Sequence, residues 1–119
     1  MGLLKKLLGG NNIQSTKPSD EWIAVYLKVS NDECGTEEEM DSIHQFTDKI
    51  AEVILKSGAG VFDGDEFGNG ECGLFMYGPN ADQLFNVMES LLRGWKPLAG
   101  GYAIKRYGAP AGLSERIEF

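Results

Sequence analysis

Apolar and polar side chains alternate without interruption over residues 21–30, EWIAVYLKVS, and this period of two predicts a half-buried β-strand. One side of that strand is aliphatic and points to the expected core: Ile23, Val25, Leu27 and Val29. The other side carries two aromatic rings and one charge: Trp22, Ala24, Tyr26 and Lys28.

Two later segments have the period of an amphipathic helix. The first begins after Thr36, which forms a capping-box pattern with Glu39, and ends before Gly58. Its apolar stripe is Met40, Ile43, Phe46, Thr47, Ile50, Val53 and Ile54. The second begins after Asn80 and ends at Gly94. Its stripe is Leu84, Val87, Met88 and Leu91.

The other elements are strands. Residues 60–67 and 71–77 predict two strands joined through a short loop, residues 100–108 predict a fourth, and the tail SERIEF, residues 114–119, suits a short edge strand. The order β-α-β-β-α-β predicts an α+β fold of the ferredoxin-like type: a four-stranded antiparallel sheet in the order 4-1-3-2, with two helices on one face. The opposite face of the sheet is then open.

A chain of 119 residues fits one domain, which we place at residues 21–119. Two interpretations stay open for residues 1–20, which begin MGLLKKLLGG: a flexible segment and linker, or a docking segment in which residues 1–8 contact a partner or a membrane surface weakly. No apolar run approaches the ~18 residues of a bilayer span, so we expect no transmembrane segment.

Charge is distributed unevenly along the chain. The net charge is −7, but residues 32–92 alone carry fourteen acids and two lysines, a net −12. Such a region repels phosphate backbones, so we expect no nucleic-acid partner and favour a protein with a basic surface. The two cysteines, Cys34 and Cys72, have no metal-ligand spacing, and this pattern suits a reducing cytoplasm.

Residues 59–78, AGVFDGDEFGNGECGLFMYG, match half of a calcium loop. Asp63 and Asp65 stand at loop positions one and three, but Phe67 stands at position five, and Leu74 stands at position twelve, where a bidentate Glu is required. We therefore expect no metal and no cofactor. No histidine or nucleophile accompanies the acids, and His44 pairs most simply with Asp48 on the helix surface, so we expect no enzyme.

A tight hairpin explains this stretch best. Gly68-Asn69-Gly70 as a three-residue loop pairs Phe67 with Glu71. This register places Gly64 and Glu66 on the helix side of the sheet. A two-residue Asn-Gly turn would instead put Asp63 and Asp65 on the core side, at a cost of several kcal/mol, and we reject it.

The open sheet face is the expected binding surface, with Lys28 and Lys105 at its rim. Its candidate partner-binding residues are Trp22, Tyr26, Asp63, Asp65, Phe67, Glu71, Phe75, Tyr77 and Tyr107. Rings on central strands also occur in RNA-recognition modules, but the basic residues of those modules are missing here. An aromatic centre with a charged rim is typical of protein interfaces.

The chain as a whole resembles a group of small, functionally uncharacterised bacterial proteins with a strand-helix start, an FDG-E-FG hairpin and a closing strand like GGYAIKRYG. The element Phe62-Asp63-Gly64-Asp65-Glu66 also resembles an aromatic-Asp-Gly-x-Glu element of the regulator of ribonuclease E activity B family. That resemblance implies an acidic ferredoxin-like protein that inhibits an enzyme by binding it.

These patterns together predict a small acidic cytoplasmic protein-binding module, a regulator, inhibitor or immunity-type protein that acts on a basic protein partner. The alternative is a homodimer formed through the open face, or a small-molecule-binding or metal-binding protein or enzyme that uses Asp63, Asp65, Glu66 and Glu71 of the hairpin.

Overall fold

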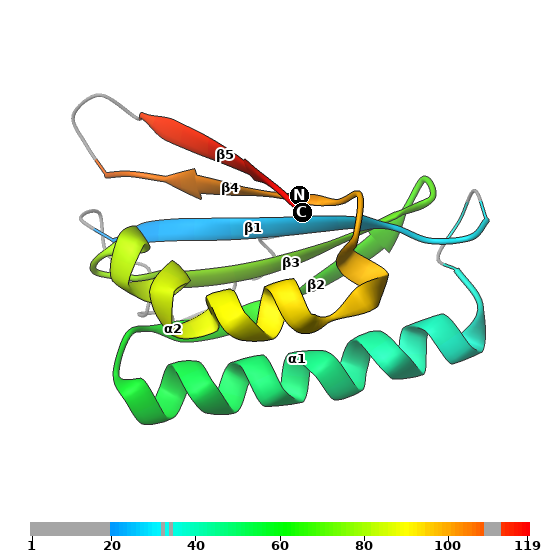
Figure 1. Cartoon of the computed structure of the whole chain (residues 1–119), viewed down its shortest axis with the longest axis horizontal. Helices are drawn as coiled ribbons and strands as arrows, with labels where there is room; N and C mark the ends of the chain where they lie inside the picture. The colour runs from blue at the N-terminus through cyan, green and yellow to red at the C-terminus, as the bar shows by residue number, and fades with distance from the viewer. Residues whose placement is uncertain (1–19, 32, 34, 109–112) are drawn as a thin grey trace, which may run out of the picture.

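The computed structural model describes residues 20–31, 33, 35–108 and 113–119, and both interpretations of residues 1–19 fall outside them. Figure 1 shows how the helices and strands of the described residues follow one another along the chain. They are β1 (Glu21–Lys28), α1 (Glu37–Ser57), β2 (Val61–Gly68), β3 (Glu71–Gly78), α2 (Ala81–Gly94), the 3₁₀ turn η2 (Lys96–Leu98), β4 (Tyr102–Arg106) and β5 (Ser114–Glu118). The mixed α+β class with two helices is confirmed.

The sheet has five antiparallel strands in the order β2-β3-β1-β4-β5. The prediction of a four-stranded sheet was therefore wrong, because β5 is added beyond β4 and changes the order of the complete sheet; the other four strands stand in the order β4-β1-β3-β2. The tail forms a fifth strand, β5, which pairs with β4 and makes a new edge, as its alternation indicated. Strands β1 and β3 pair side by side inside the sheet, as expected.

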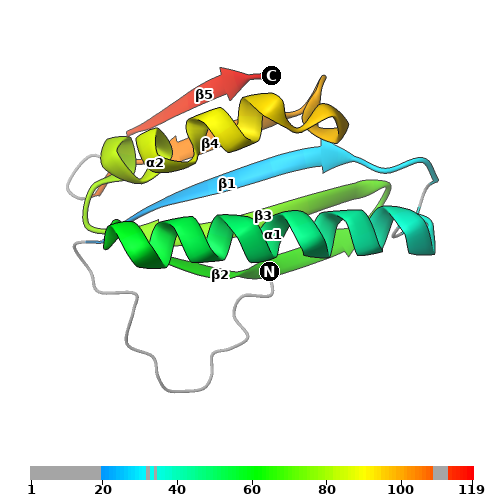
Figure 2. The ribbon, with the colours of Figure 1, turned by 60° about the horizontal axis from the view of Figure 1, so that its bottom comes forward.

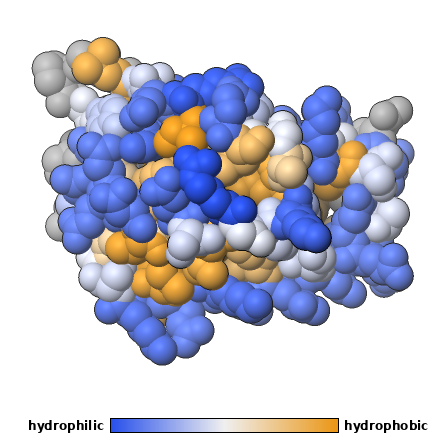
Figure 3. All heavy atoms as spheres, viewed as in Figure 1, coloured by the Kyte–Doolittle hydropathy of each residue, from blue (hydrophilic) through white to orange (hydrophobic). Residues whose placement is uncertain are grey.

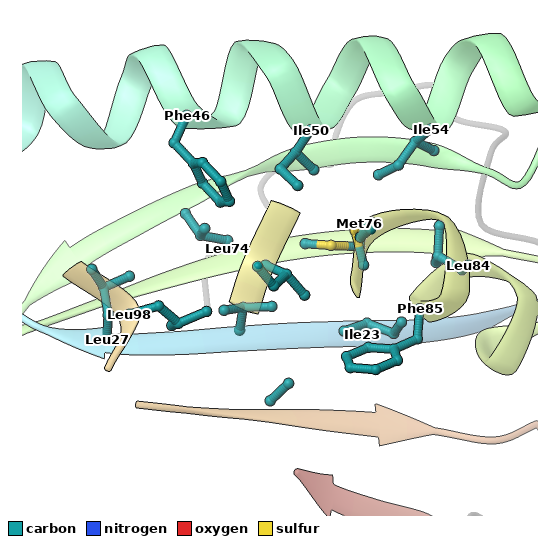
Figure 4. Close-up of a cluster of buried hydrophobic side chains, with 14 of the residues drawn as sticks. Ile23, Leu27, Phe46, Ile50, Ile54, Leu74, Met76, Leu84, Phe85 and Leu98 are labelled. Carbon is teal, nitrogen blue, oxygen red and sulfur yellow. The ribbon is translucent and has the colours of Figure 1, made fainter. Parts of the chain in front are cut away.

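Both helices cover the same face of the sheet, α1 over the β2–β3 side and α2 over the β1–β4 side (Figures 1 and 2). Their apolar stripes meet the aliphatic side of the strands. Figure 4 shows Phe46, Ile50 and Ile54 of α1 directed toward Leu74 and Met76 of β3. Ile50, Ile54, Leu74 and Met76 are each at most 1% exposed, so this layer is the core.

Side-chain caps fix where the helices begin. The Thr36 side chain accepts from Glu39 N, the Glu39 carboxylate accepts from Thr36 N, and the helix ends at Gly58 with φ 73°. The Asn80 side chain accepts from Gln83 N at the start of α2. Glu39 also accepts from Ser30 N and Oγ, which ties α1 to the loop after β1. These hydrogen bonds lower the pKa of Glu39.

The β2–β3 hairpin has the register that the sequence argument rejected. Asn69 (φ 55°) and Gly70 (φ 77°) form a two-residue turn, and Phe67 pairs with Cys72 instead of Glu71. Positive φ at both central residues is typical of a type I′ turn, whose twist matches that of the flanking strands. Phe67 consequently lies on the helix side of the sheet.

A β-bulge removes the cost that argued against this register. Phe62 pairs with Met76 and Gly64 with Phe75, so Asp63 is the extra residue and does not lie opposite a core side chain. Gly64 has φ 153°, a conformation that favours glycine. Asp65 does lie opposite Leu74, but β2 is an edge strand and its side chain stays 26% exposed, so only one carboxylate approaches the core, and it keeps access to water.

The surface of the molecule is largely hydrophilic in the view of Figure 1. Figure 3 shows polar residues over most of this view, with apolar atoms in separate smaller patches between them. No helix among the described residues is long and apolar enough to cross a membrane.

Candidate functional site

The face of the sheet away from the helices, which we call the open face, carries five partly exposed aromatic rings. They are Trp22, Tyr26, Phe75, Tyr77 and Tyr102. Tyr26 makes an edge contact with Phe75 (ring centroids 6.2 Å apart) and a tilted contact with Tyr102 (5.1 Å). Ala24, on the same side of β1, is 0% exposed beneath them. Tyr26 therefore joins three of the rings, and Trp22 is the cross-strand neighbour of Tyr77; we call the five rings together the aromatic layer.

Strands β4 and β5 supply two arginines to this layer. The guanidinium carbon of Arg106 lies 5.0 Å from the centroid of Trp22, and that of Arg116 lies 3.8 Å from the centroid of Tyr102. Arg116 also pairs with Glu118. Guanidinium groups over ring faces are attracted by the ring quadrupole. We call Tyr102, Arg106 and Arg116 the arginine half of the open face.

Strands β2 and β3 form a hollow of about 550 Å³ on the same face. It is lined by the rings of Trp22, Tyr26, Phe75 and Tyr77, by two carboxylates, Glu66 and Glu71, and at the hairpin end by residues that include Phe67. Each carboxylate has a glycine as its cross-strand neighbour on β2–β3, because Glu66 pairs with Gly73 and Glu71 pairs with Gly68. We call Glu66, Glu71, Gly73 and Phe75 the acid half of the open face.

Gly73 has a steric function in this half. A Cβ atom on Gly73 would lie 2.9 Å from Cζ of Phe75 and 3.1 Å from Cε1 of Tyr26. These distances are too short for ordinary contact, so both rings lean over the glycine. The missing side chain lets the two rings take their positions beside the carboxylates.

The carboxylates have no cation close to them within the described part of the chain. Neither Glu66 nor Glu71 lies within 4.0 Å of a Lys, Arg or His nitrogen there, although Lys28 pairs with Glu71 across β1–β3. Burial, followed by the charges of Tyr102, Glu71 and Glu66, raises the pKa of Tyr26. The acid half is therefore an electronegative surface beside exposed rings.

Asp65 and Phe67, two of the predicted site residues, lie on the opposite face. Their partners Leu74 and Cys72 are core residues, and Oδ2 of Asp65 lies 3.5 Å from Nε2 of His44 on α1. The His44 ring also makes an edge contact with Phe67, at 5.8 Å. His44 thus joins α1 to the hairpin, and the expected pair with Asp48 is replaced by the pair with Asp65. Asp63 in the bulge is exposed. The pKa of Tyr77 is raised first by the partial burial of Tyr77 and then by the negative charge of Asp63.

Tyr107 and Lys105 were also expected on the open face, and both lie on the helix side. Lys105 is 8% exposed, and its Nζ lies 2.8 Å from Oδ1 of Asp82 at the start of α2. Oη of Tyr107 lies 2.6 Å from the same oxygen and 3.1 Å from Oε1 of Glu115. The hydrogen bond to Asp82, followed by burial, raises the pKa of Tyr107 to about 12. This network holds β4 and β5 against α2.

Sequence reasoning missed Tyr102, Arg106, Arg116 and the functional side of Glu66. Tyr102 and Arg106 were missed because the two sides of β4 were exchanged: Lys105 was expected to point to water, which would turn its neighbours toward the core. The signal that could have corrected it is Asp82 in the first turn of α2, which offers a buried lysine a partner. The Asn-Gly dipeptide, read as a type I′ turn, would have placed Glu66 correctly.

Metal-binding groups do not gather in the described residues. No three of His, Cys, Asp or Glu there lie close enough together to hold a metal ion. Cys72 is 0% exposed, and burial, with the charges of Asp65 and Glu71, raises the pKa of its thiol to about 12, so it is a poor nucleophile. Comparisons of the chain with family models, curated proteins and solved structures give no match. Function is therefore inferred from the open face itself.

Proposed function

We propose that this protein is a small acidic binding module, a cytoplasmic regulator, inhibitor or immunity-type protein that recognises a basic protein surface through its open face. The observation that carries the proposal is the layer of five aromatic rings next to two carboxylates without a cation. Rings of this size supply most of the energy at protein interfaces, and charges beside them select the partner.

The charge distribution supports the same class of partner. Of the fourteen acids in residues 32–92, six lie on α1 and four on the hairpin. Such a concentration of negative charge attracts a basic surface and disfavours nucleic acid. The acids of α1 lie on the opposite side of the sheet, and Glu66 and Glu71 are the two of this set that line the hollow of the open face. We also propose that β1 to β4 with α1 and α2 form a ferredoxin-like unit to which β5 is added, since the chain order and the neighbours of β1 and β3 support it.

The proposal is tested by capture from a cell lysate on the immobilised protein at low and high salt. We expect a basic protein to be retained at about 50 mM salt and released at about 500 mM, because screening shortens the reach of charges. Tyr77→Ala removes a ring of the open face and should abolish retention. Leu55→Ala, at a 72% exposed position of α1, is the matched control and should retain the protein. Equal retention by both variants, or none by the natural chain, overturns the proposal.

A second candidate function is self-association through the same face. It is favoured by the charge pattern of the open face, because its acid half and its arginine half are complementary. Two copies related by a twofold axis would place each acid half against the arginine half of the other copy. Light scattering over a range of concentrations distinguishes the two functions. A dimer that Tyr77→Ala dissociates would assign this surface to self-assembly.

A further inference from the structure

The acid half has the size and lining of a ligand site. Its hollow of about 550 Å³ is within the range of small-molecule pockets, roughly 300–1,000 Å³. Gly68 and Gly73 contribute no side chains, so the space in front of the rings stays free. A side chain and part of its backbone can enter this hollow.

The chemistry of the lining selects a cation. Glu66 and Glu71 are diagonal neighbours on β2–β3, and strand geometry places the Cα atoms of such neighbours about 7–8 Å apart. A single planar cation between them can donate to both carboxylates and rest on the edge or face of Tyr26 or Phe75. Aromatic rings combined with carboxylates form the usual surroundings of a bound ammonium or guanidinium group.

The arginine half indicates which cation fits. On the open face both ring-bound cations are arginines, Arg106 over Trp22 and Arg116 over Tyr102. A guanidinium group is planar, weakly hydrated and rich in donors, so it stacks on rings and bridges carboxylates better than an ammonium group does. The acid half offers the same rings together with unpaired carboxylates, but within the described residues no arginine of the chain reaches it.

We propose that the hollow of the acid half receives an arginine side chain of the protein partner, which donates to Glu66 and Glu71 while it lies against Tyr26 and Phe75. This inference rests on the proposed function and names the group that the open face recognises. The partner is a protein that presents an exposed arginine on a basic surface.

The test is a titration of the ¹⁵N-labelled protein with N-acetyl-arginine amide, followed by NMR. We expect saturable shifts of the Gly68 and Gly73 amides. The uncharged citrulline analogue should bind about tenfold more weakly, since it keeps the shape and loses the charge. The lysine analogue should also bind more weakly. Equal binding by the citrulline analogue overturns the inference. Tighter binding by the lysine analogue also overturns it, because the preferred ligand is then a lysine side chain.

Paired variants remove the same charge at two places. Glu66→Gln with Glu71→Gln should weaken binding of N-acetyl-arginine amide about tenfold. Glu38→Gln with Glu52→Gln changes two exposed carboxylates of α1, on the other side of the sheet, and should leave the affinity within about twofold. Equal weakening by both pairs would show a general charge effect and overturn the site. Dispersed amide spectra of both variants report that each is folded.

The outcomes separate this inference from the proposed function. If the arginine probe fails to bind while Tyr77→Ala still abolishes capture of a basic protein, the inference fails and the binding module stands. If the probe binds but no basic protein is captured, the hollow is a guanidinium site, and the proposed function as a module that binds a basic protein fails. If dilution alone moves the Gly73 amide and light scattering shows a dimer, a second copy occupies the hollow and the arginine of another protein is excluded.

Discussion

The two halves of the open face use the same aromatic layer in different ways. In the arginine half, the chain places its own cations over the rings, with Arg106 on Trp22 and Arg116 on Tyr102. In the acid half, Tyr26 and Phe75 lie beside Glu66 and Glu71, and no cation of the described residues covers them. The arginines of the first half have ring partners within the chain, whereas the carboxylates of the second half have no cationic partner among the described residues.

Because of this difference, one half of the surface can stabilise the fold while the other half keeps carboxylates that a ligand could pair with. Ring–cation contacts within the chain hold β4 and β5 in place and contribute to folding. Carboxylates without a cation contribute nothing of this kind, and their mutual repulsion costs some stability. A cost that folding does not recover is typical of groups kept for binding. The contrast between the halves therefore supports the proposed binding site more specifically than the total charge does.

Gly73→Ala tests the acid half with the largest expected effect. The added Cβ would lie 2.9 Å from Phe75 and 3.1 Å from Tyr26, so the two rings must move. We expect a loss of about 1–3 kcal/mol in the free energy of unfolding, measured by urea denaturation. Gly68→Ala is the matched control, because its Cβ meets no atom within 4 Å and its φ is not positive. A change of less than about 0.5 kcal/mol in both variants would show that the rings adapt freely.

Arg106→Gln tests the arginine half by uncovering Trp22. We expect a loss of about 0.5–1 kcal/mol in unfolding free energy, the usual value of an exposed ring–cation contact. Quenching of tryptophan fluorescence by acrylamide should increase, because Trp22 becomes accessible while Trp95 stays stacked on Phe46 at 3.9 Å. Lys96→Gln removes a charge on η2 and serves as the control. Unchanged quenching would mean that Arg106 does not shield the ring.

The fold class could be predicted from the sequence because its signals are local and agree with one another. The alternation of β1 separates Ile23 and Val25 from Trp22 and Tyr26, and the structure keeps that separation. The capping box at Thr36 also forms as the pattern indicates. Each of these features depends on residues within a few positions, so no knowledge of the tertiary structure was needed.

The composition of the site could be predicted only in part, because two choices of parity depend on distant residues. The register of β2 depends on the bulge at Asp63, which removes one carboxylate from the core side, and on His44 of α1, which lies next to Asp65. The parity of β4 depends on Asp82 of α2, which pairs with Lys105. A slip of one residue exchanges the two faces of a strand, and this is why Phe67 and Tyr107 were assigned to the wrong side.

Asp82→Asn weakens the contact between α2 and β4, the strand that carries Arg106. Its expected effect on the free energy of unfolding is smaller and depends on pH. Hydrogen bonds from Lys105, the main cause, and from Tyr107 lower the pKa of Asp82. A carboxylate with a lowered folded-state pKa contributes stability above its unfolded pKa of about 3.9 and loses it as pH falls through the folded-state value. Because Asp82 is 61% exposed, we expect the variant to lose about 1 kcal/mol or less at pH 7. Urea melts should show this difference at pH 7 and its decrease as the pH falls below about 3.9 toward the lowered folded-state pKa.

Glu66→Gln has the smallest expected effect, and its sign distinguishes a binding carboxylate from a structural one. Glu66 is exposed in the hollow and shares it with Glu71, so removing its charge relieves repulsion. We expect no loss of stability and a gain of up to about 0.5 kcal/mol at low salt, which disappears at high salt as screening removes the repulsion.

The control for Glu66→Gln is Glu39→Gln, because Glu39 is a carboxylate that the chain does use. It accepts hydrogen bonds from Ser30 and Thr36, so its replacement should lower stability at both salt concentrations. Urea melts of the two variants give opposite signs if the acid half is kept for a partner. A loss in Glu66→Gln equal to that in Glu39→Gln would mean that Glu66 stabilises the folded chain, and the contrast between the two halves of the open face would then no longer indicate a binding site.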